Sequence, residues 1–127
     1  MVSPVSGQPP GRCAWLLLGL ALALPACRPP GRPSDAVERF YAAVTVGDCA
    51  AALGALGTAF RTRVEQKGNC DRLLEEMREH PLERVLDTQV DGRNRAAQLV
   101  RVRLRGHKTD VIIRVQAEGG QWKIFSM

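Results

Sequence analysis

The sequence predicts an α+β domain in which three helices precede and pack on a curved four-stranded antiparallel meander. The first observation is that apolar residues recur with the 3.6-residue period of a helix between residues 34 and 80. The second is that apolar and polar residues alternate from residue 82 onward, with the two-residue period of a strand. The third is the pair Gly119 and Gly120, which is typical of the loop between two adjacent antiparallel strands.

The first helix is expected to begin at Ser34 or Asp35. It is expected to end at Gly47, because glycine readily takes the left-handed conformation that follows many helices. Asp35 and Glu38 have the spacing of a capping box. The apolar stripe of this helix consists of Val37, Phe40, Tyr41 and Val44.

Two further helices are expected to follow the capping residues Asp48 and Asn69. Between them, Thr58 can restart a short turn that holds Phe60 and Val64. The apolar stripe of the second helix consists of Cys49, Ala52, Leu53 and Leu56, and that of the third consists of Cys70, Leu73, Leu74 and Met77.

Four strands are expected, at residues 84–90, 96–105, 110–118 and 121–127. The glycine pair sets the register of the last two strands. The resulting pairs are Glu118 with Gln121, Ala117 with Trp122, Val115 with Ile124 and Arg114 with Phe125. In the first strand, Leu86, Thr88 and Val90 are expected to point inward, which requires an odd-length loop or a bulge after Val90.

The turn at residues 106–109 sets the register of the two middle strands. The resulting pairs are Arg105 with Asp110, Leu104 with Val111, Val102 with Ile113 and Val100 with Val115. Both turns therefore assign the same residues to one apolar face. This register also places Arg101 opposite Arg114, and like charges facing across strands destabilise a sheet. Solvent, a carboxylate such as Asp87 or Glu118, the ring of Phe125, or an external anion or protein would have to offset this repulsion.

An apolar run near the start of the chain, from Ala14 to Cys27, follows a basic residue, Arg12. It is shorter than the roughly 20 residues that span a membrane, but it suits a signal peptide. Its last four residues, Leu24-Pro25-Ala26-Cys27, resemble a bacterial lipobox, although Pro25 departs from the commonest choice. The resemblance implies that Cys27 is lipidated; ordinary signal cleavage and an uncleaved anchor are the alternatives.

The expected organisation is therefore a lipoprotein signal peptide at residues 1–26, a lipidated cysteine with a Pro-rich spacer at 27–33, and a folded domain at 34–127. In two-membrane bacteria, Arg28 after the cysteine implies an outer-membrane lipoprotein that faces the periplasm.

The predicted export signal implies a different fate for each of the cysteines. Cys13 leaves with the signal peptide and Cys27 takes the lipid, so Cys49 and Cys70 remain in an oxidising compartment. Both lie in the first turn of a predicted helix and on its apolar stripe. We predict a disulfide between them, with two free thiols as the alternative.

The folded domain resembles the nuclear transport factor-like superfamily, which has cone-shaped α+β domains. The resemblance lies in the segments at residues 36–43, 47–53 and 121–124, together with the order of helices and strands. The superfamily includes isomerases, cyclases and dehydratases, and also members that bind ligands or proteins without catalysis. The resemblance therefore implies a fold and leaves the activity open.

A ligand pocket inside the cone is expected to be lined by Phe40, Tyr41, Val44, Val102, Ile113, Val115 and Trp122. The inner sheet face offers Thr88, Gln98 and Ser126 but no carboxylate, so catalysis is not expected. Tyr41 can equally be a core residue whose hydroxyl contacts solvent. No metal site or cofactor is expected, because His80 and His107 are isolated in the sequence. A nucleic-acid partner is not expected either, because the predicted export signal places the domain in the cell envelope.

The outer sheet face is expected to be basic. It carries Arg101, Arg103, Arg105, Arg114 and Lys123. Three interpretations remain open: a solvated face, a protein interface that includes a homodimer, and a site for anionic envelope polymers or lipids.

Together these patterns favour a membrane-anchored, non-catalytic envelope lipoprotein that binds a small apolar ligand or a protein partner. One alternative is an interaction or dimerisation module that acts through the basic face. Another is an enzyme of the isomerase or dehydratase type.

Overall fold

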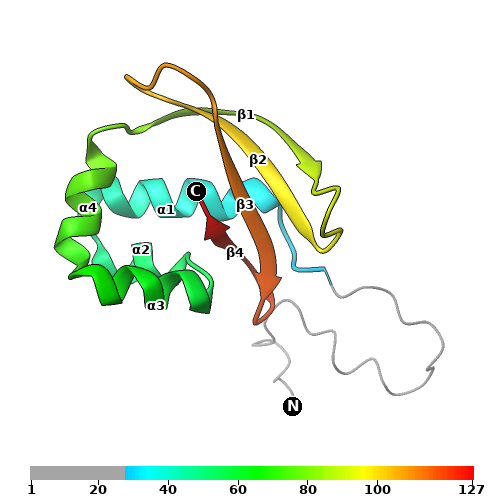
Figure 1. Ribbon diagram of the computed structural model, residues 1–127, viewed down its shortest axis with the longest axis horizontal. Helices are drawn as coiled ribbons and strands as arrows, with labels where there is room; N and C mark the ends of the chain where they lie inside the picture. The colour runs from blue at the N-terminus through cyan, green and yellow to red at the C-terminus, as the bar shows by residue number, and fades with distance from the viewer. Residues whose placement is uncertain (1–27) are drawn as a thin grey trace, which may run out of the picture.

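The computed structural model describes residues 28–127, so the predicted signal peptide and Cys27 lie outside the described residues. The described chain is α+β, as predicted, with helices that precede the strands (Figure 1). The helices are α1 (Pro33–Val46), α2 (Cys49–Gly54), α3 (Thr58–Lys67) and α4 (Cys70–Arg78). The strands are β1 (Leu82–Val90), β2 (Ala97–Leu104), β3 (Val111–Glu118) and β4 (Gln121–Ser126).

Helix α1 crosses behind the sheet in Figure 1 and buries the whole predicted stripe, from Val37 to Val44. It begins earlier than expected, because Asp35 Oδ2 accepts a hydrogen bond of 2.8 Å from the backbone N–H of Arg32. The reciprocal capping contact thus lies three residues upstream of the predicted one, and Glu38 is exposed. Gly47 has φ of 76° and ends the helix as predicted.

The predicted caps of α2 and α4 are confirmed. Asp48 Oδ1 accepts from the Ala51 N–H at 3.0 Å, and Asn69 Oδ1 accepts from the Arg72 N–H at 3.1 Å. The expected short turn at Thr58 is instead the ten-residue helix α3, so four helices precede the sheet. No residue of α3 is fully buried, and its apolar pattern is correspondingly weak in the sequence.

The sheet has the strand order β1-β2-β3-β4, all antiparallel, which confirms the meander. The glycine hairpin gives the predicted pairs of β3 and β4 from Glu118 to Val115. Beyond Val115 a bulge shifts the register, so Arg114 pairs with Ser126 and the predicted pairing with Phe125 is wrong. A bulge of this kind leaves no local sequence signal here.

The predicted register of β2 and β3 is wrong by two residues. Val100 pairs with Ile113 and Val102 with Val111, because the connection between the strands spans residues 105–110. A slip of two residues preserves the face of every side chain. The predicted apolar face is therefore buried as expected, while Arg101 lies opposite Ile112 rather than Arg114.

Strand β1 departs most from prediction. Its irregularities lie between Leu82 and Arg84 and between Val85 and Asp87, rather than after Val90. They reset the alternation, so Leu82 and Val85 pack against the core. Of the predicted inward residues, Thr88 and Val90 are exposed and Leu86 is half-buried.

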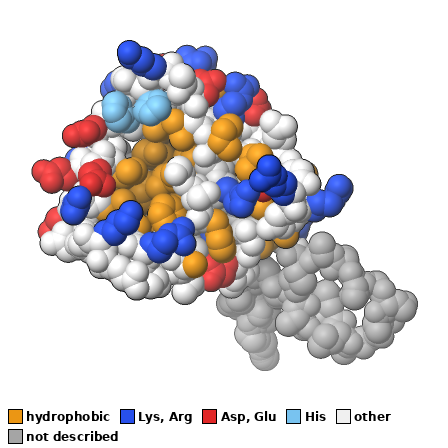
Figure 2. All heavy atoms as spheres, in the orientation of Figure 1, with side chains coloured by type: hydrophobic (Ala, Val, Ile, Leu, Met, Phe, Trp, Pro, Cys, Tyr) orange, Lys and Arg blue, Asp and Glu red, His pale blue; other side chains and the backbone are white. Residues whose placement is uncertain are grey.

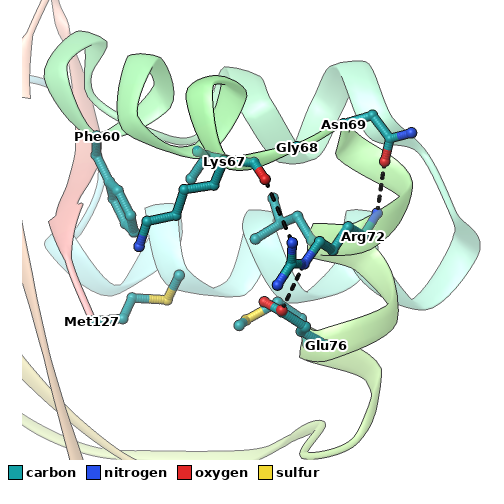
Figure 3. Close-up of a pocket in the computed structure, with 10 residues that line it drawn as sticks. Phe60, Lys67, Gly68, Asn69, Arg72, Glu76 and Met127 are labelled. Atoms are coloured by element: carbon teal, nitrogen blue, oxygen red, sulfur yellow. Dashed lines mark hydrogen bonds and ion pairs between the residues drawn. The ribbon is translucent and has the colours of Figure 1, made fainter.

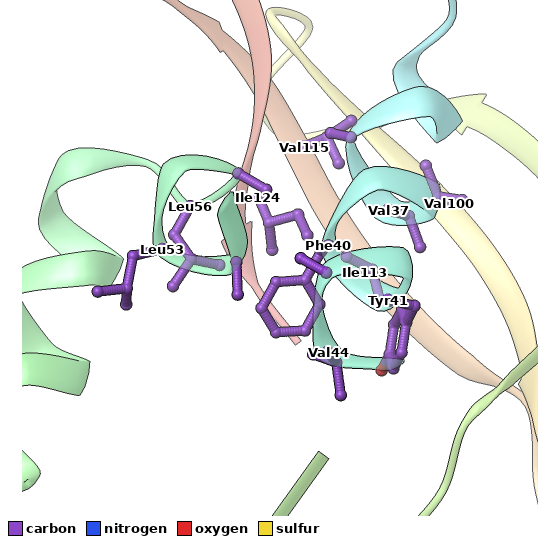
Figure 4. Close-up of a cluster of buried hydrophobic side chains, with 14 of the residues drawn as sticks. Val37, Phe40, Tyr41, Val44, Leu53, Leu56, Val100, Ile113, Val115 and Ile124 are labelled. Carbon is purple, nitrogen blue, oxygen red and sulfur yellow. The ribbon is translucent and has the colours of Figure 1, made fainter. Parts of the chain in front are cut away.

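The hydrophobic core lies between α1, α2, α4 and the inner sheet face. Phe40 is at its centre in Figure 4, with Leu53, Leu56 and Ile124 on one side and Tyr41 on the other. The backbone also joins these layers: the Ile124 N–H donates to the Ala55 carbonyl at 2.9 Å. This bond fixes β4 against the end of α2.

A disulfide joins Cys49 and Cys70, as predicted, with their Cα atoms 6.0 Å apart. It links the first residue of α2 to the first residue of α4. None of the helices in residues 28–127 has the length and apolar character needed to cross a membrane.

Candidate functional site

Two adjoining hollows form one apolar groove along α3, α4 and the end of β4. Their volumes are about 290 Å³ and about 250 Å³, and they share Glu76, Met77 and Met127. The apolar lining consists of Phe60, Val64, Leu73, Met77 and Met127 in the first hollow, and Tyr41, Leu104 and Val111 in the second. Figure 2 shows this face as an apolar depression with the histidines at one end and basic side chains at the other.

The wall of the first hollow is built from the apolar faces of two helices. Phe60 and Val64 lie one turn apart on α3, and Leu73 and Met77 lie one turn apart on α4. Residues four apart lie on the same face of a helix, so each pair presents a continuous apolar surface. Met127, which is 39% exposed, closes the space between them at the end of β4 (Figure 3).

The rim of the first hollow carries both signs of charge. The Arg72 guanidinium donates to Glu76 at 3.3 Å and to the backbone carbonyl of Lys67 at 3.5 Å. The Lys67 side chain extends toward Phe60 and Met127 (Figure 3). Within residues 28–127, no carboxylate lies within ion-pair distance of Lys67. Lys67 is therefore available to an anionic group bound in the groove.

Tyr41 forms part of the second hollow, although it is only 5% exposed. Its ring packs edge-on against Phe40, with centroids 5.2 Å apart. Burial raises the pKa of the Tyr41 hydroxyl to about 12. The hydroxyl is therefore neutral at physiological pH and can donate or accept a hydrogen bond.

The other predicted pocket residues lie elsewhere. The side chains of Phe40, Val44, Val102, Ile113 and Val115 fill the space between α1 and the sheet and are almost completely buried. They contribute packing, and none of them lines the groove.

Trp122 lies beside a separate hollow of about 190 Å³, together with Arg39 and Asp35. Only Tyr41 of the predicted pocket set therefore meets the groove, which lies beside the core rather than inside it.

The predicted basic face is balanced by carboxylates from neighbouring strands and turns. Arg101 pairs with Asp87 and, at 2.9 Å, with Asp110. Arg103 also pairs with Asp110 at 2.9 Å. The hydrogen bond from Arg103 holds the pKa of the Asp110 carboxyl below its ordinary value, and Asp87 raises the pKa of Arg101.

Another arginine of this face, Arg114, approaches Asp91 at 2.7 Å. The Asp91 side chain is buried, and its pKa is lowered mainly by a hydrogen bond from the Arg93 N–H. Lys123 donates to the carbonyl of Gly54, and burial lowers its pKa. Arg105 remains exposed. This face therefore offers far less unpaired positive charge than its arginines suggest.

The carboxylates that would support catalysis do not lie beside Tyr41. Asp87 and Asp110 are engaged by arginines on the outer sheet face. Glu118 accepts hydrogen bonds from the Thr58 N–H at 2.9 Å and from its hydroxyl at 2.6 Å, at the start of α3. The one carboxylate that lines the hollow of Tyr41, Glu76, is exposed and held by Arg72. Within the described chain, no carboxylate that lines the hollow of Tyr41 is free of an arginine partner.

Sequence reasoning missed most of the groove. We predicted a short turn for Phe60 and Val64 and a helix for Met77, but their contact with Met127 depends on how α3 and α4 pack. The two histidines, expected to be isolated, lie with their rings 5.4 Å apart at the end of the groove. The only sequence signal was the pair of apolar residues four apart on each helix.

Comparisons with known proteins give no assignment: no family model, no curated protein and no solved structure matches this chain.

Proposed function

We propose that this chain is a bacterial envelope lipoprotein, anchored through Cys27, whose domain binds a small, mainly apolar ligand in the groove without catalysis. The lipobox-like segment before Arg28 supports the anchor and an outer-membrane location that faces the periplasm. A helix laid across a four-stranded meander supports a nuclear transport factor-like domain. The groove itself is the observation that carries the binding function.

The groove has the size and lining of a small-molecule site. Ligand sites commonly occupy about 300–1,000 Å³ and combine apolar walls with a few polar groups. The two joined hollows reach that size, and their polar groups include Lys67 in the first hollow and the Tyr41 hydroxyl in the second. Met77 and Met127 stand where the hollows meet, and methionine side chains adapt readily to different ligand shapes.

The apolar area sets the scale of affinity. A ligand that hides about 250 Å² of apolar surface gains about 6 kcal/mol at about 25 cal/mol per Å². That gain corresponds to a Kd of tens of micromolar before the costs of ordering the ligand are counted. The expected ligand is therefore bound weakly unless its polar end also contacts the rim.

A matched pair of variants tests the binding site. Val64→Glu places a carboxylate on the wall of the groove, whereas Val46→Glu makes the same change on a residue of α1 that is 76% exposed. The probe is a neutral, environment-sensitive naphthylamine dye, titrated against residues 28–127 whose fold is first verified by circular dichroism. We expect saturable binding by the wild type and by Val46→Glu, and at least a tenfold loss in Val64→Glu. Equal binding by the two variants, or none by the wild type, would refute the site.

A separate experiment tests the anchor. The full chain with Cys27→Ser should lose incorporation of labelled fatty acid and should no longer sediment with membranes. A wild-type chain that is recovered without lipid would overturn the anchor and leave the groove untouched.

A further inference from the structure

Both histidines of the chain meet at one end of the groove. His80 lies in the connection between α4 and β1, and His107 lies in the turn between β2 and β3. Their ring centroids are 5.4 Å apart, and the ring planes are nearly perpendicular at 81°. Figure 2 shows them side by side above the apolar depression. The fold thus joins two side chains that the sequence keeps far apart.

The backbone determines which nitrogen of each ring is protonated. Nδ1 of His80 lies 3.0 Å from the carbonyl oxygen of Arg105, and Nδ1 of His107 lies 3.0 Å from that of Thr109. A carbonyl oxygen only accepts hydrogen bonds, so each Nδ1 must carry a proton and donate it. In the neutral rings, both Nε2 atoms then have a free lone pair. Metal-ligating histidines commonly show this arrangement, with the other nitrogen bonded to a backbone carbonyl.

The two rings are also held in place by the backbone around them. Gly106 has φ of 81°, and a Cβ atom there would come within 3.3 Å of His80 Nδ1. The Arg105 N–H donates to the Pro81 carbonyl at 2.8 Å. The turn that carries His107 is therefore bonded directly to the connection that carries His80. Such rigidity favours metal binding, because little order remains to be imposed on the ligands.

We propose that His80 and His107 form a two-histidine site for a late first-row divalent cation, with Cu²⁺ bound more tightly than Zn²⁺. Zn–nitrogen bonds of about 2.0–2.1 Å at a tetrahedral angle place the centroids of two ligating imidazoles about 5 Å apart. The observed separation of 5.4 Å matches this spacing. Imidazole suits both ions, and the general affinity order places Cu²⁺ above Zn²⁺.

The remaining coordination positions are open. Across residues 28–127, no group of three or more histidine, cysteine or carboxylate side chains is placed to hold a metal ion. Glu76 borders the same hollow, but Arg72 holds its carboxylate. Water, or the polar end of a molecule in the groove, would complete the coordination sphere.

The test is a titration of the full chain in detergent with Cu²⁺ and, separately, Zn²⁺, using a histidine-free affinity tag. His80→Asn and His107→Asn are the decisive variants, because the asparagine amide keeps a donor near the position of Nδ1 but has no counterpart of Nε2. Lys108→Asn, in the same turn, is the matched control. Calorimetry gives the stoichiometry, and electron paramagnetic resonance shows nitrogen coupling to Cu²⁺.

We expect one Cu²⁺ per chain, coupled to two nitrogens, in the wild type and in Lys108→Asn. In each histidine variant, the affinity for Cu²⁺ should fall by more than the roughly 10–100-fold that is lost when only a hydrogen-bonding partner of a metal ligand is removed. Thermal unfolding without metal should be similar in all four proteins. Binding that survives in both histidine variants would identify an adventitious site, and absence of binding in the wild type would overturn the proposal.

Discussion

Removal of the Cys49–Cys70 disulfide is the change whose effect the structure defines most directly. The bond joins the first residues of α2 and α4 across a sequence separation of 21 residues. Both cysteines pack against the hydrophobic core. The variant replaces both by alanine, so that no free thiol remains in residues 28–127 to form other bonds.

The expected loss follows from the length of the closed loop. A bridge that closes a loop of this length restricts the unfolded chain by about 3 kcal/mol in the chain-entropy model. For a domain of about 100 residues, each kcal/mol moves the Tm by about 4–8 °C. The double variant should therefore unfold roughly 12–24 °C below the oxidised wild type, and the reduced wild type should resemble it.

Helix α4 should loosen first. Its fully buried residues are Leu73 and Leu74, and the rest of its apolar face is only half-buried. Because α4 forms one wall of the groove through Leu73 and Met77, dye binding should weaken when the bond is reduced, even at temperatures where the sheet stays folded. Hydrogen exchange should accelerate in residues 70–78 before it accelerates in β2 and β3.

The assay is urea unfolding of residues 28–127, followed by circular dichroism with and without reductant. The double variant is the control for the reductant, and it should give the same curve under both conditions. If oxidised and reduced wild type differed by less than about 1 kcal/mol, the inference that this bond restrains the unfolded chain would be wrong.

Three further changes have defined outcomes. Gly57→Ala would bring a Cβ atom within 2.6 Å of the ring of Phe125 and should lower the free energy of unfolding by about 1–3 kcal/mol. Gly54→Ala meets nothing within 4 Å and should raise it by about 0.5–1 kcal/mol, as measured by urea unfolding. Tyr41 is the chain's single tyrosine, so its ultraviolet titration should show ionisation near pH 12. Asp91 has a pKa below the ordinary 3.8, so Asp91→Asn should flatten the loss of stability that the wild type shows in acid.

The signs of the two pH effects follow from linkage. The folded pKa of Tyr41 is raised, so its contribution to stability is complete below about pH 10 and is lost as the pH rises toward 12. The folded pKa of Asp91 is depressed, so its contribution is present above pH 3.8 and is lost as the pH falls through the folded pKa. Ionisation of Tyr41 near pH 10 would contradict the first inference, and equal acid profiles of wild type and Asp91→Asn would contradict the second. A Gly57→Ala protein as stable as the wild type would contradict the packing argument.

The elements of the fold that depend on local chemistry were predictable from the sequence. Asp48 and Asn69 cap helices because their side chains bond to nearby backbone N–H groups, which is a matter of a few residues. The stripe from Val37 to Val44 and the glycine hairpin are equally local. The disulfide was also predicted, because the predicted export signal left only Cys49 and Cys70 and both lie at helix starts on apolar faces.

The face of the sheet on which each side chain lies was predictable for β2 and β3, but the exact pairing of residues across the strands was not. Alternation identifies which residues point inward, and a slip by two residues preserves that pattern. The length of the connection at residues 105–110 decides the pairing, and residue type alone did not reveal where β2 ends. The bulges in β1 are harder still, since they reset the alternation that was being used to find the face.

The groove and the histidine pair depend on how distant elements pack. His80 meets His107 only because the end of α4 lies against the turn after β2. Each residue, taken alone, resembles an ordinary exposed histidine. No periodicity connects them, so local patterns could not have predicted the pair.

The outer sheet face shows why the charges along one strand do not give the charge of a surface. Arg101 and Arg103 alternate along β2, and alone they predict a basic stripe. The acidic partners come from other segments: Asp87 from β1, and Asp110 from the turn before β3. Once these pairs form, an external anion must compete with them for each arginine. Lys67 has no such competitor within residues 28–127, and it also lines the apolar groove. An anionic ligand with an apolar body should therefore prefer the rim of the groove, even though the sheet carries more positive side chains.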